Sequence, residues 1–303
     1  MCSLGCYAYQ QKRFESNMLS STPCYQAEPS DALRDPNAWS DEALTVSWVG
    51  HATVLINFYG STILTDPVLV KRLAPPYLGG RNLGIRRRTE CPYDFKDVPP
   101  IDLVLLSHAH HDHWDIASLK FFDESTDAIV PRQTRDLIPN GHFGNVTELD
   151  WGQTHTVGEL TVRAFKVQHW GYRAGKPKGA RGYNGYVLGK RGARIVFFGD
   201  SAYHDRSSMR RPVNWVERVG AGPYDLCILP IGDYIYRHNH MSPEEAWSIY
   251  KQLGGKKFLP IHWRTFILSP VPIQEPLERL QKAAQEEGVN VICTTPGEAV
   301  RVK

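Results

Sequence analysis

The sequence lacks the long hydrophobic run that a membrane-spanning helix requires, since no stretch approaches about 18 consecutive apolar residues. It also lacks an excess of one charge, because 35 Lys and Arg residues are balanced by 32 Asp and Glu residues, giving a net charge of +3. This balance argues against a protein that binds nucleic acid through a general basic surface. A hydrophobic content of 42% and a charged content of 22% are typical of a globular chain.

Paired cysteines are missing as well. The six cysteines form no CxxC pair, and in a chain of 303 residues they do not resemble a disulfide scaffold. We therefore expect Cys91, Cys227 and Cys293 to be reduced, structural thiols.

The polar N-terminal segment lacks the apolar stretch of a secretory signal. We predict that residues 1–43 form a loose arm and that the protein is cytoplasmic, with peripheral contact to a membrane as an open alternative.

Short β-rich segments dominate the chain from Leu44 onward. We expect strands at residues 45–50, 53–58, 61–65, 101–106, 128–130, 160–167, 183–188, 194–198, 226–229, 257–261 and 289–293. Helical patterns occur at residues 115–122, 243–253 and 276–287. Ser242 before Pro243 is typical of a helix start. Because strands come first and a helix follows each half, residues 44–303 are predicted to form one domain with two sheets between helices.

A histidine-rich run, SHAHHDHWD at residues 107–115, directly follows the predicted buried strand at 101–106. Residues two apart in an extended chain point to the same side, so His108 and His110 can share one metal ion. Asp112 and His113, one turn further on, can face a second ion from the start of the next helix. Imidazole and carboxylate ligands at this density suit zinc or iron(II). The run therefore predicts a metal site, the alternative being a histidine-rich surface loop.

A dinuclear site needs further ligands, and three candidates stand at the ends of later predicted strands. His169 follows the strand at 160–167, and His262 ends the strand at 257–261. Asp200 follows Gly199, a residue that lets the backbone turn so that the carboxylate can bridge two ions. Functional side chains gather at strand ends in layered α/β folds, so we expect these three beside the histidine-rich run.

The order HxHxDH, His, Asp, His resembles that of the metallo-β-lactamase superfamily, over residues 44–303. Several segments further resemble the branch that contains N-acylphosphatidylethanolamine-hydrolysing phospholipase D and its bacterial relatives. These segments are residues 48–53, 64–67, 99–102, 168–170, 199–203, 229–232, 240–246 and 261–266. The resemblance implies an α/β fold, specifically a four-layer αββα sandwich.

The same resemblance implies a site with two divalent metal ions, zinc in the first place, with iron or manganese as alternatives. One ion would be held by His108, His110 and His169. The other would be held by Asp112, His113 and His262, and Asp200 would be shared between the two.

Four further residues receive roles from the resemblance. Asp66 would steady the histidine-rich loop, or else simply form a turn before a proline. His240 would contact the substrate or the leaving group, or else cap and pack the helix that follows it. His51 lies in a loop that borders the pocket and is a candidate for substrate binding. Arg264 stands where several relatives have glycine, so its bulk and charge would alter the pocket and contact the substrate.

The implied activity is hydrolysis by a hydroxide that two metal ions generate at neutral pH, with Asp112, Asp200 and His240 as the catalytic residues. The sequence contains no Gly-x-Ser-x-Gly elbow, which argues against a serine nucleophile. A phosphodiesterase similar to the phospholipase branch is the first hypothesis. The alternatives are a sugar-phosphate lactonase similar to L-ascorbate-6-phosphate lactonase, and a non-catalytic metal-binding or membrane-associated protein.

Two groups of cations flank the metal motif and could hold a phosphate or an anionic membrane surface, unless they are merely solvated loop charges. They are Lys71, Arg72, Arg81, Arg86, Arg87 and Arg88 before it, and Arg173, Lys176, Lys178 and Arg181 after His169. A phospholipid would also need an apolar groove. The candidates for it are Tyr77, Leu78, Leu83, Ile85, Trp170, Tyr172, Tyr234, Ile235 and Tyr236. We expect a small-molecule or phospholipid substrate and no specific nucleic-acid partner, and the sequence gives no indication of oligomeric state.

Overall fold

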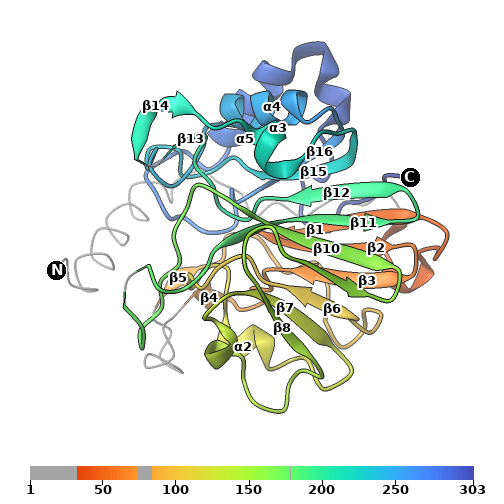
Figure 1. Ribbon diagram of the computed structural model, residues 1–303. Coiled ribbons are helices and arrows are strands. Elements are labelled where there is room, and N and C mark those ends of the chain that lie inside the picture. Colours follow the sequence, from red (N-terminus) through yellow and green to blue (C-terminus); the bar gives the residue numbers. More distant parts are fainter. Residues whose placement is uncertain (1–32, 74–83, 178, 206) are drawn as a thin grey trace.

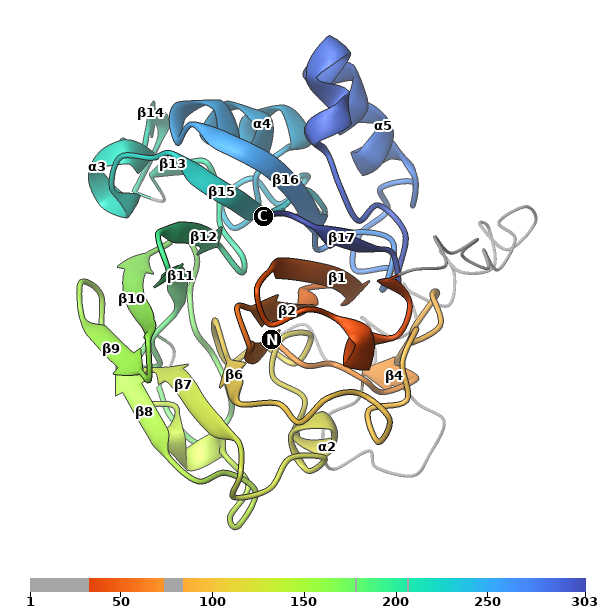
Figure 2. The ribbon, with the colours of Figure 1, turned by 90° about the vertical axis from the view of Figure 1, so that its right-hand side faces the viewer.

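The computed structural model describes residues 33–73 and 84–303, except residues 178 and 206, and it contains two large β-sheets packed face to face (Figures 1 and 2). The first sheet has the order β17 (Ala299–Arg301), β1 (Leu44–Gly50), β2 (Thr53–Phe58), β3 (Ser61–Thr65), β6 (Leu103–Leu105), β7 (Asp127–Pro131), β8 (Val146–Leu149). The second has the order β16 (Gly255–Ile261), β15 (Tyr224–Pro230), β12 (Ala193–Phe197), β11 (Asn184–Lys190), β10 (Leu160–Lys166), β9 (Thr154–Val157). Two small hairpins complete the strands: β4 (Arg72–Leu73) with β5 (Ile85–Arg86), and β13 (His204–Asp205) with β14 (Ser208–Pro212).

Helices cover the two sheets unequally. The outer side of the second sheet carries α3 (Trp215–Val219), α4 (Pro243–Gln252) and α5 (Glu275–Ala284) (Figure 1). The outer side of the first sheet carries the single-turn α2 (Ile116–Leu119) and irregular segments. The expected αββα order is therefore present, with one thin helical layer among the described residues. None of the described helices is long and apolar enough to cross a membrane.

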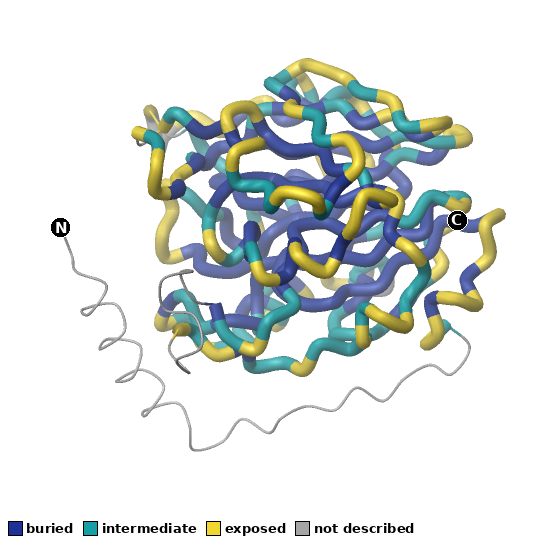
Figure 3. The backbone as a smooth tube through the Cα atoms, turned by 90° about the horizontal axis from the view of Figure 1, so that it is seen from below, coloured by how far each residue is buried: buried dark blue, intermediate teal, exposed yellow. Residues whose placement is uncertain are grey.

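The first sheet is buried on both faces, as the apolar run at residues 101–106 predicts. Leu103 and Leu105 point into the core between the two sheets, whereas Val104 and Leu106 belong to a second cluster on the outer face. All four side chains are at most 1% exposed. The backbone tube in Figure 3 shows buried strands at the centre and exposed residues along the loops. The ends of these strands are consequently held in a rigid frame, where functional side chains can be positioned accurately.

The two ends of the described domain meet in the first sheet. β17 pairs with β1 in antiparallel register, with Thr45 opposite Arg301, and the backbone N–H of Leu44 donates to the carbonyl of Lys303 at 2.8 Å. Before β1, Trp39 is only 8% exposed and packs in the outer cluster. The described structure thus includes residues 33–43 of the predicted arm, and residues 1–32 of that arm lie outside the described part of the chain.

Two predicted elements differ from those observed. The expected strand at 289–293 is not a strand: the 3₁₀ helix η5 (Gln285–Asn290) occupies its start, and a single bridge joins Val291 to Phe258. The expected helix at 115–122 is shortened to the single turn α2. The helix predicted at 243–253 matches α4 closely, because Ser242 caps it through a reciprocal bond with Glu245.

Candidate metal centre

The histidine-rich run leaves the first sheet directly after β6. His108 forms a single β-bridge with Tyr183, and His110 lies in a bend two residues further on. Asp112 and His113 lie in a tight turn, in which the backbone N–H groups of His113 and Trp114 donate to the carbonyl of His110 at 3.2 and 2.8 Å. These two residues therefore precede α2, in contrast to their predicted position at the start of the helix. The turn still directs them toward the same region as His108 and His110.

The other three predicted ligands come from the second sheet. His169 follows β10, Asp200 follows β12, and His262 directly follows β16. Gly199 has a φ of +56°, and a Cβ atom there would lie 2.5 Å from the Cβ of Ser107. Only glycine permits both the turn and this close approach between the sheets, which is why Asp200 can reach the histidine-rich run.

Three imidazoles from the two sheets converge on one point. His108 Nε2 lies 2.9 Å from His110 Nδ1, and His169 Nε2 lies 3.1 Å from the same atom. His108 and His169 are buried, and His110 is partly buried. A neutral imidazole carries its one proton on either ring nitrogen, so these three rings can direct lone pairs at a common position. We call these residues the three-histidine group.

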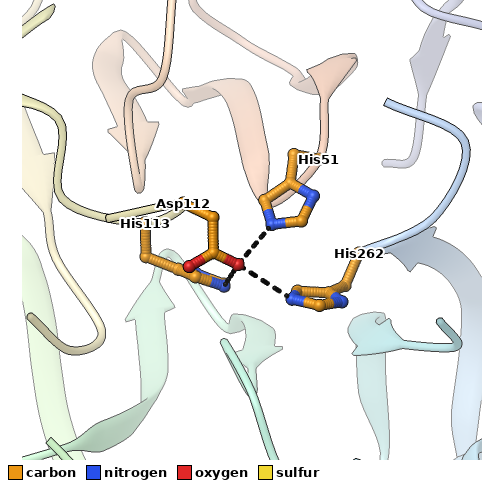
Figure 4. Close-up of side chains that lie close together, drawn as sticks. All are labelled: His51, Asp112, His113 and His262. Carbon is orange, nitrogen blue, oxygen red and sulfur yellow. Dashed lines mark hydrogen bonds and ion pairs between the residues drawn. The ribbon is translucent and has the colours of Figure 1, made fainter. Parts of the chain in front are cut away.

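A second cluster lies beside the first and contains Asp112, His113 and His262; we call it the Asp112 group (Figure 4). Asp112 Oδ2 lies 3.6 Å from His113 Nε2 and 3.3 Å from His262 Nε2. Asp200 stands between the two groups. Its Oδ2 lies 3.2 Å from both His113 Nε2 and His262 Nε2, and 3.9 Å from His108 Nε2. The fold thus brings all seven predicted ligands together around one carboxylate.

The outward-facing nitrogens of these imidazoles have their own partners. His113 Nδ1 lies 2.7 Å from Asp66 Oδ2, and His169 Nδ1 lies 3.1 Å from the carbonyl of Asn239. Since these acceptors take the Nδ1 proton, the Nε2 atoms face the centre. Asp66 therefore orients His113, as expected from the resemblance, in addition to ending β3 in a turn.

Two residues of this outer set were not identified from the sequence. Ser107 donates its backbone N–H to Asp66 at 2.7 Å, and its hydroxyl lies 3.0 Å from His108 Nδ1. Asp233 Oδ2 lies 3.3 Å from His262 Nδ1. Asp233 closely follows the buried strand β15, so the strand-end argument that identified Asp200 would also have identified this carboxylate.

Burial keeps the three-histidine group neutral. Burial, together with the neighbouring imidazoles, lowers the pKa of His108 and His169 well below the ordinary value. Burial also lowers the pKa of His110 to about 4. A neutral imidazole is the form that binds a metal ion, so these three residues are ready to act as ligands at neutral pH.

In the Asp112 group, neighbouring charges outweigh the effect of burial on the pKa values. Burial would raise the pKa of Asp200, but the charges on His113 and His262 hold it well below its usual range. Burial would likewise lower the pKa of His113, but Asp200 and Asp112 raise it to about 10. Two ionised carboxylates thus attract positive charge to this position, where metal cations can replace the protons.

The donor set suits a metal centre, and the unpartnered atoms of the structure support this. Several buried atoms of the predicted ligands have no hydrogen-bond partner among the described residues; they are His110 Nε2, His113 Nε2, His262 Nε2 and Asp200 Oδ1. Buried polar atoms without partners are rare in folded proteins unless an ion or water binds them. Nitrogen and oxygen donors at this density can hold zinc, iron or manganese. The assignment of each side chain to a particular ion remains a prediction.

The remaining candidates lie around this centre. His240 precedes α4, and its Nδ1 lies 3.8 Å from Asp200 Oδ2. Arg264 lines a small hollow beside His262, together with Asp233 and Phe266, and has a φ of +61°. His51 is only 1% exposed, and its Nε2 lies 3.1 Å from Asp112 Oδ2.

Three of the arginines considered for phosphate or membrane contact have structural partners instead. Arg87, Arg173 and Arg181 are 7%, 6% and 1% exposed. Arg87 donates to backbone carbonyls, and Arg173 donates to the carbonyls of Ala109 and Trp114 at 3.2 and 2.9 Å, bracing the histidine-rich turn. The cations with partly or fully exposed side chains are Lys71, Arg72, Arg86, Arg88 and Lys176, while Arg81 and Lys178 lie outside the described residues.

The candidates for an apolar groove divide in a similar way. Tyr172, Ile235 and Tyr236 are 43%, 46% and 46% exposed, on the segments that follow His169 and precede His240. Tyr234 is only 7% exposed and packs into the fold. Tyr77, Leu78 and Leu83 lie outside the described residues.

Comparison with known proteins agrees with this geometry. The family described as Beta-lactamase superfamily domain matches residues 61–263. An uncharacterized protein of Mycobacterium tuberculosis is 33% identical over 288 residues, covering 88% of this chain and 72% of that protein. The mitochondrial N-acyl-phosphatidylethanolamine-hydrolyzing phospholipase D of Saccharomyces cerevisiae is 31% identical over 261 residues, covering 82% of this chain and 54% of that protein.

Among solved structures, the isothiocyanate hydrolase from Delia radicum gut bacteria superimposes with a TM-score of 0.65 at 19% identity, covering 84% of this chain and 98% of that one. At this identity the likeness concerns the fold, and it agrees with the two-sheet sandwich. The resemblance drawn from the motifs is confirmed by the family match, which spans the metal cluster except for His51 and includes strands of both sheets. The chain therefore belongs to the β-lactamase superfamily, as one of its metal-dependent hydrolases.

Proposed function

We propose that this chain is a phosphodiesterase that uses two divalent metal ions and hydrolyses a phospholipid, as the name of its yeast relative describes. The observation that carries the proposal is the position of Asp200, whose Oδ2 faces the three-histidine group and the Asp112 group at once. A shared carboxylate is typical of two-metal hydrolytic sites. The likeness to the yeast phospholipase over 82% of this chain supports a phospholipid as substrate.

In this proposal His108, His110 and His169 hold one ion, whereas Asp112, His113 and His262 hold the other. Zinc suits these nitrogen and oxygen donors best, with iron or manganese as alternatives. When bound, two such ions polarise a phosphoryl oxygen and lower the pKa of water toward about 7. The protein orients the ligands through the carboxylates and carbonyls that fix each Nδ1 proton.

His240 and Arg264 contact the substrate in this proposal. The side chain of His240 is 13% exposed, so one edge of its ring can reach a molecule that enters the centre. Its N–H can donate to a phosphate oxygen or to the departing oxygen. Arg264 lines the hollow beside His262 and supplies a cation for an anionic group next to the scissile bond.

A phospholipid substrate requires that the site face a membrane surface. Exposed apolar side chains near the centre, Tyr172, Ile235 and Tyr236, support a peripheral contact of this kind. Aromatic side chains favour the interface between headgroups and acyl chains. We therefore propose that these segments touch the membrane while the substrate headgroup reaches the metal ions.

The test compares two substrates at matched concentration on protein loaded with zinc: N-acylphosphatidylethanolamine in mixed micelles and a water-soluble sugar-phosphate lactone. We expect release of the phosphatidic acid product from the lipid, and loss of this activity in Asp200→Ala. Bis(p-nitrophenyl) phosphate serves only to show that the metal centre is active, because generic dinuclear sites hydrolyse it. Efficient lactone opening without lipid cleavage would replace the phospholipase proposal with the lactonase. Failure to bind two metal ions would contradict both.

A further inference from the structure

His51 occupies the tight turn between β1 and β2, and its ring is directed toward the Asp112 group (Figure 4). Its Nε2 lies 3.1 Å from Asp112 Oδ2, and the side chain is only 1% exposed. An ionised carboxylate has no hydrogen to give, so the proton of this contact belongs to His51 Nε2. The imidazole therefore donates a hydrogen bond to a carboxylate that is itself a predicted metal ligand.

The backbone of His51 is fixed in an unusual conformation. Its φ is +53°, a left-handed value that residues with a Cβ adopt rarely. Its N–H donates to Thr265 Oγ1 at 2.6 Å, and its carbonyl accepts from the backbone N–H of His262 at 3.0 Å and from Trp48 Nε1 at 2.9 Å. These bonds lock the His51 turn against the segment that carries His262, so the ring has little freedom to move away from Asp112.

His51 differs from the other partners of Asp112. The contacts of Asp112 with His113 and His262, at 3.6 and 3.3 Å, are made by residues that would themselves bind the second ion. A nitrogen that binds a metal ion through its lone pair cannot also donate to Asp112. Among the described contacts, the bond from His51 is the one that persists when the ion is present.

We propose that His51 is a positioning residue that fixes the carboxylate of Asp112 for the second metal ion. The inference rests on the proposed two-metal site and goes beyond it, because it gives His51 a role toward a ligand rather than toward the substrate. Its hydrogen bond restricts rotation of the Asp112 carboxylate, so that one arrangement of ligands is prepared before the ion arrives. Outer partners of this kind contribute to metal affinity without touching the metal.

The test titrates metal-free protein with Zn²⁺ by calorimetry, which resolves the two ions without any substrate. In His51→Phe, which keeps an aromatic ring but removes the donor, we expect one ion to bind about 10- to 100-fold more weakly and the other to change little. His51→Gln restores an N–H donor on a side chain of similar reach, and should recover most of the lost affinity. His142→Phe is the matched control, since that histidine bonds the carbonyl of Phe122 instead of a predicted ligand.

A double-variant comparison separates positioning from simple packing. Asp112→Ala should weaken the same ion, and adding His51→Phe to it should cause no further loss, because the bond no longer has an acceptor. Unchanged affinities in His51→Phe would overturn the inference and leave the two-metal proposal intact. Equal weakening of both ions, additive losses in the double variant, or no recovery in His51→Gln would also overturn it. Wild-type protein that binds fewer than two ions would instead contradict the proposed function.

Discussion

Asp200 and Asp66 are two buried carboxylates of the site that contact the predicted ligands from different positions. Asp200 Oδ2 faces both groups of ligands, whereas Asp66 contacts His113 and Ser107 behind one of them. We predict that Asp200→Ala abolishes turnover and binding of both ions, because each ion loses a ligand. Asp66→Ala should lower activity and affinity by about 10- to 100-fold. Elemental analysis of both loaded variants, with kcat on one phosphodiester, checks the order. Equal activity losses with full metal retention in both variants would contradict it.

The backbone conformation and the side chain of Arg264 lead to two separate predictions. Its φ of +61° is a conformation that glycine adopts without cost, while other residues lose about 1 kcal/mol or more. Arg264→Gly should therefore raise the free energy of unfolding by about 1 kcal/mol, and Arg264→Ala, which keeps the strain, should not. Both variants should raise the KM for an anionic substrate if the guanidinium binds it. Urea unfolding curves and KM measurements on the two variants test each part independently.

At the scale of elements, an ion pair between a buried arginine and a half-exposed carboxylate joins the loop after β10 to the segment after β7. Arg181 is 1% exposed and donates to both carboxylate oxygens of Asp136, at 2.8 and 2.9 Å. The hydrogen bonds from Arg181 lower the pKa of Asp136, so the pair contributes stability above the unfolded-state pKa of about 3.9 and loses it as the pH falls further. Arg181 would be left buried without its carboxylate in a variant at position 136.

We therefore predict that Asp136→Asn lowers the free energy of unfolding by about 1 kcal/mol at pH 7, because solvent screens the half-exposed carboxylate, and that this difference is smaller at pH 3, below the unfolded-state pKa of about 3.9. Asp150→Asn is the matched control, because Asp150 is equally exposed, at 47%, but pairs with the exposed Arg132 at 3.5 Å. An exposed pair of this kind contributes little. Urea unfolding at both pH values measures the free energy of unfolding of each variant. Equal effects of the two substitutions at pH 7 would contradict the prediction.

The strand ends were predictable from the sequence, and the contacts around them were not. Apolar runs followed by His or Asp located His108, His169, Asp200 and His262, because a buried strand has a strong hydrophobic pattern. The role of Ser107 depends on which side of a turn faces a neighbouring strand, and no local pattern in the sequence reports that. Residues such as Arg173 and Arg181 were misjudged for a related reason: the sequence shows their charge, whereas their burial depends on the tertiary structure.

At the scale of the whole molecule, the metal centre lies across the two sheets. His108, His110, Asp112 and His113 come from the first sheet, and His169, Asp200 and His262 come from the second. Ions bound to both sets would link the sheets at one edge. The two-sheet order was predictable from the family resemblance, but the thin helical layer on the first sheet was not, because irregular segments cover an apolar face without a periodic pattern.

Removal of metal should therefore destabilise the entire domain. A ligand that binds only the folded state adds about 2.7 kcal/mol of stability at a free concentration 100 times its Kd. We predict a higher Tm in Zn²⁺ than in a chelator for the wild-type chain, and a much smaller difference for Asp200→Ala. Scanning calorimetry at several Zn²⁺ concentrations measures the dependence. A Tm that is independent of metal in the wild type would contradict a link between the sheets through bound ions.

The pairing of β17 with β1 has a consequence for synthesis in the cell. Thr45 and Arg301 are neighbours in the sheet, yet nearly the whole chain separates them. The ribosome synthesises Thr45 long before Arg301. One edge of β1 therefore stays unpaired while the rest of the domain is synthesised. Unpaired strand edges can form hydrogen bonds with strands of other chains. Nascent chains that stall or end before Ala299 should consequently be the ones that chaperones retain.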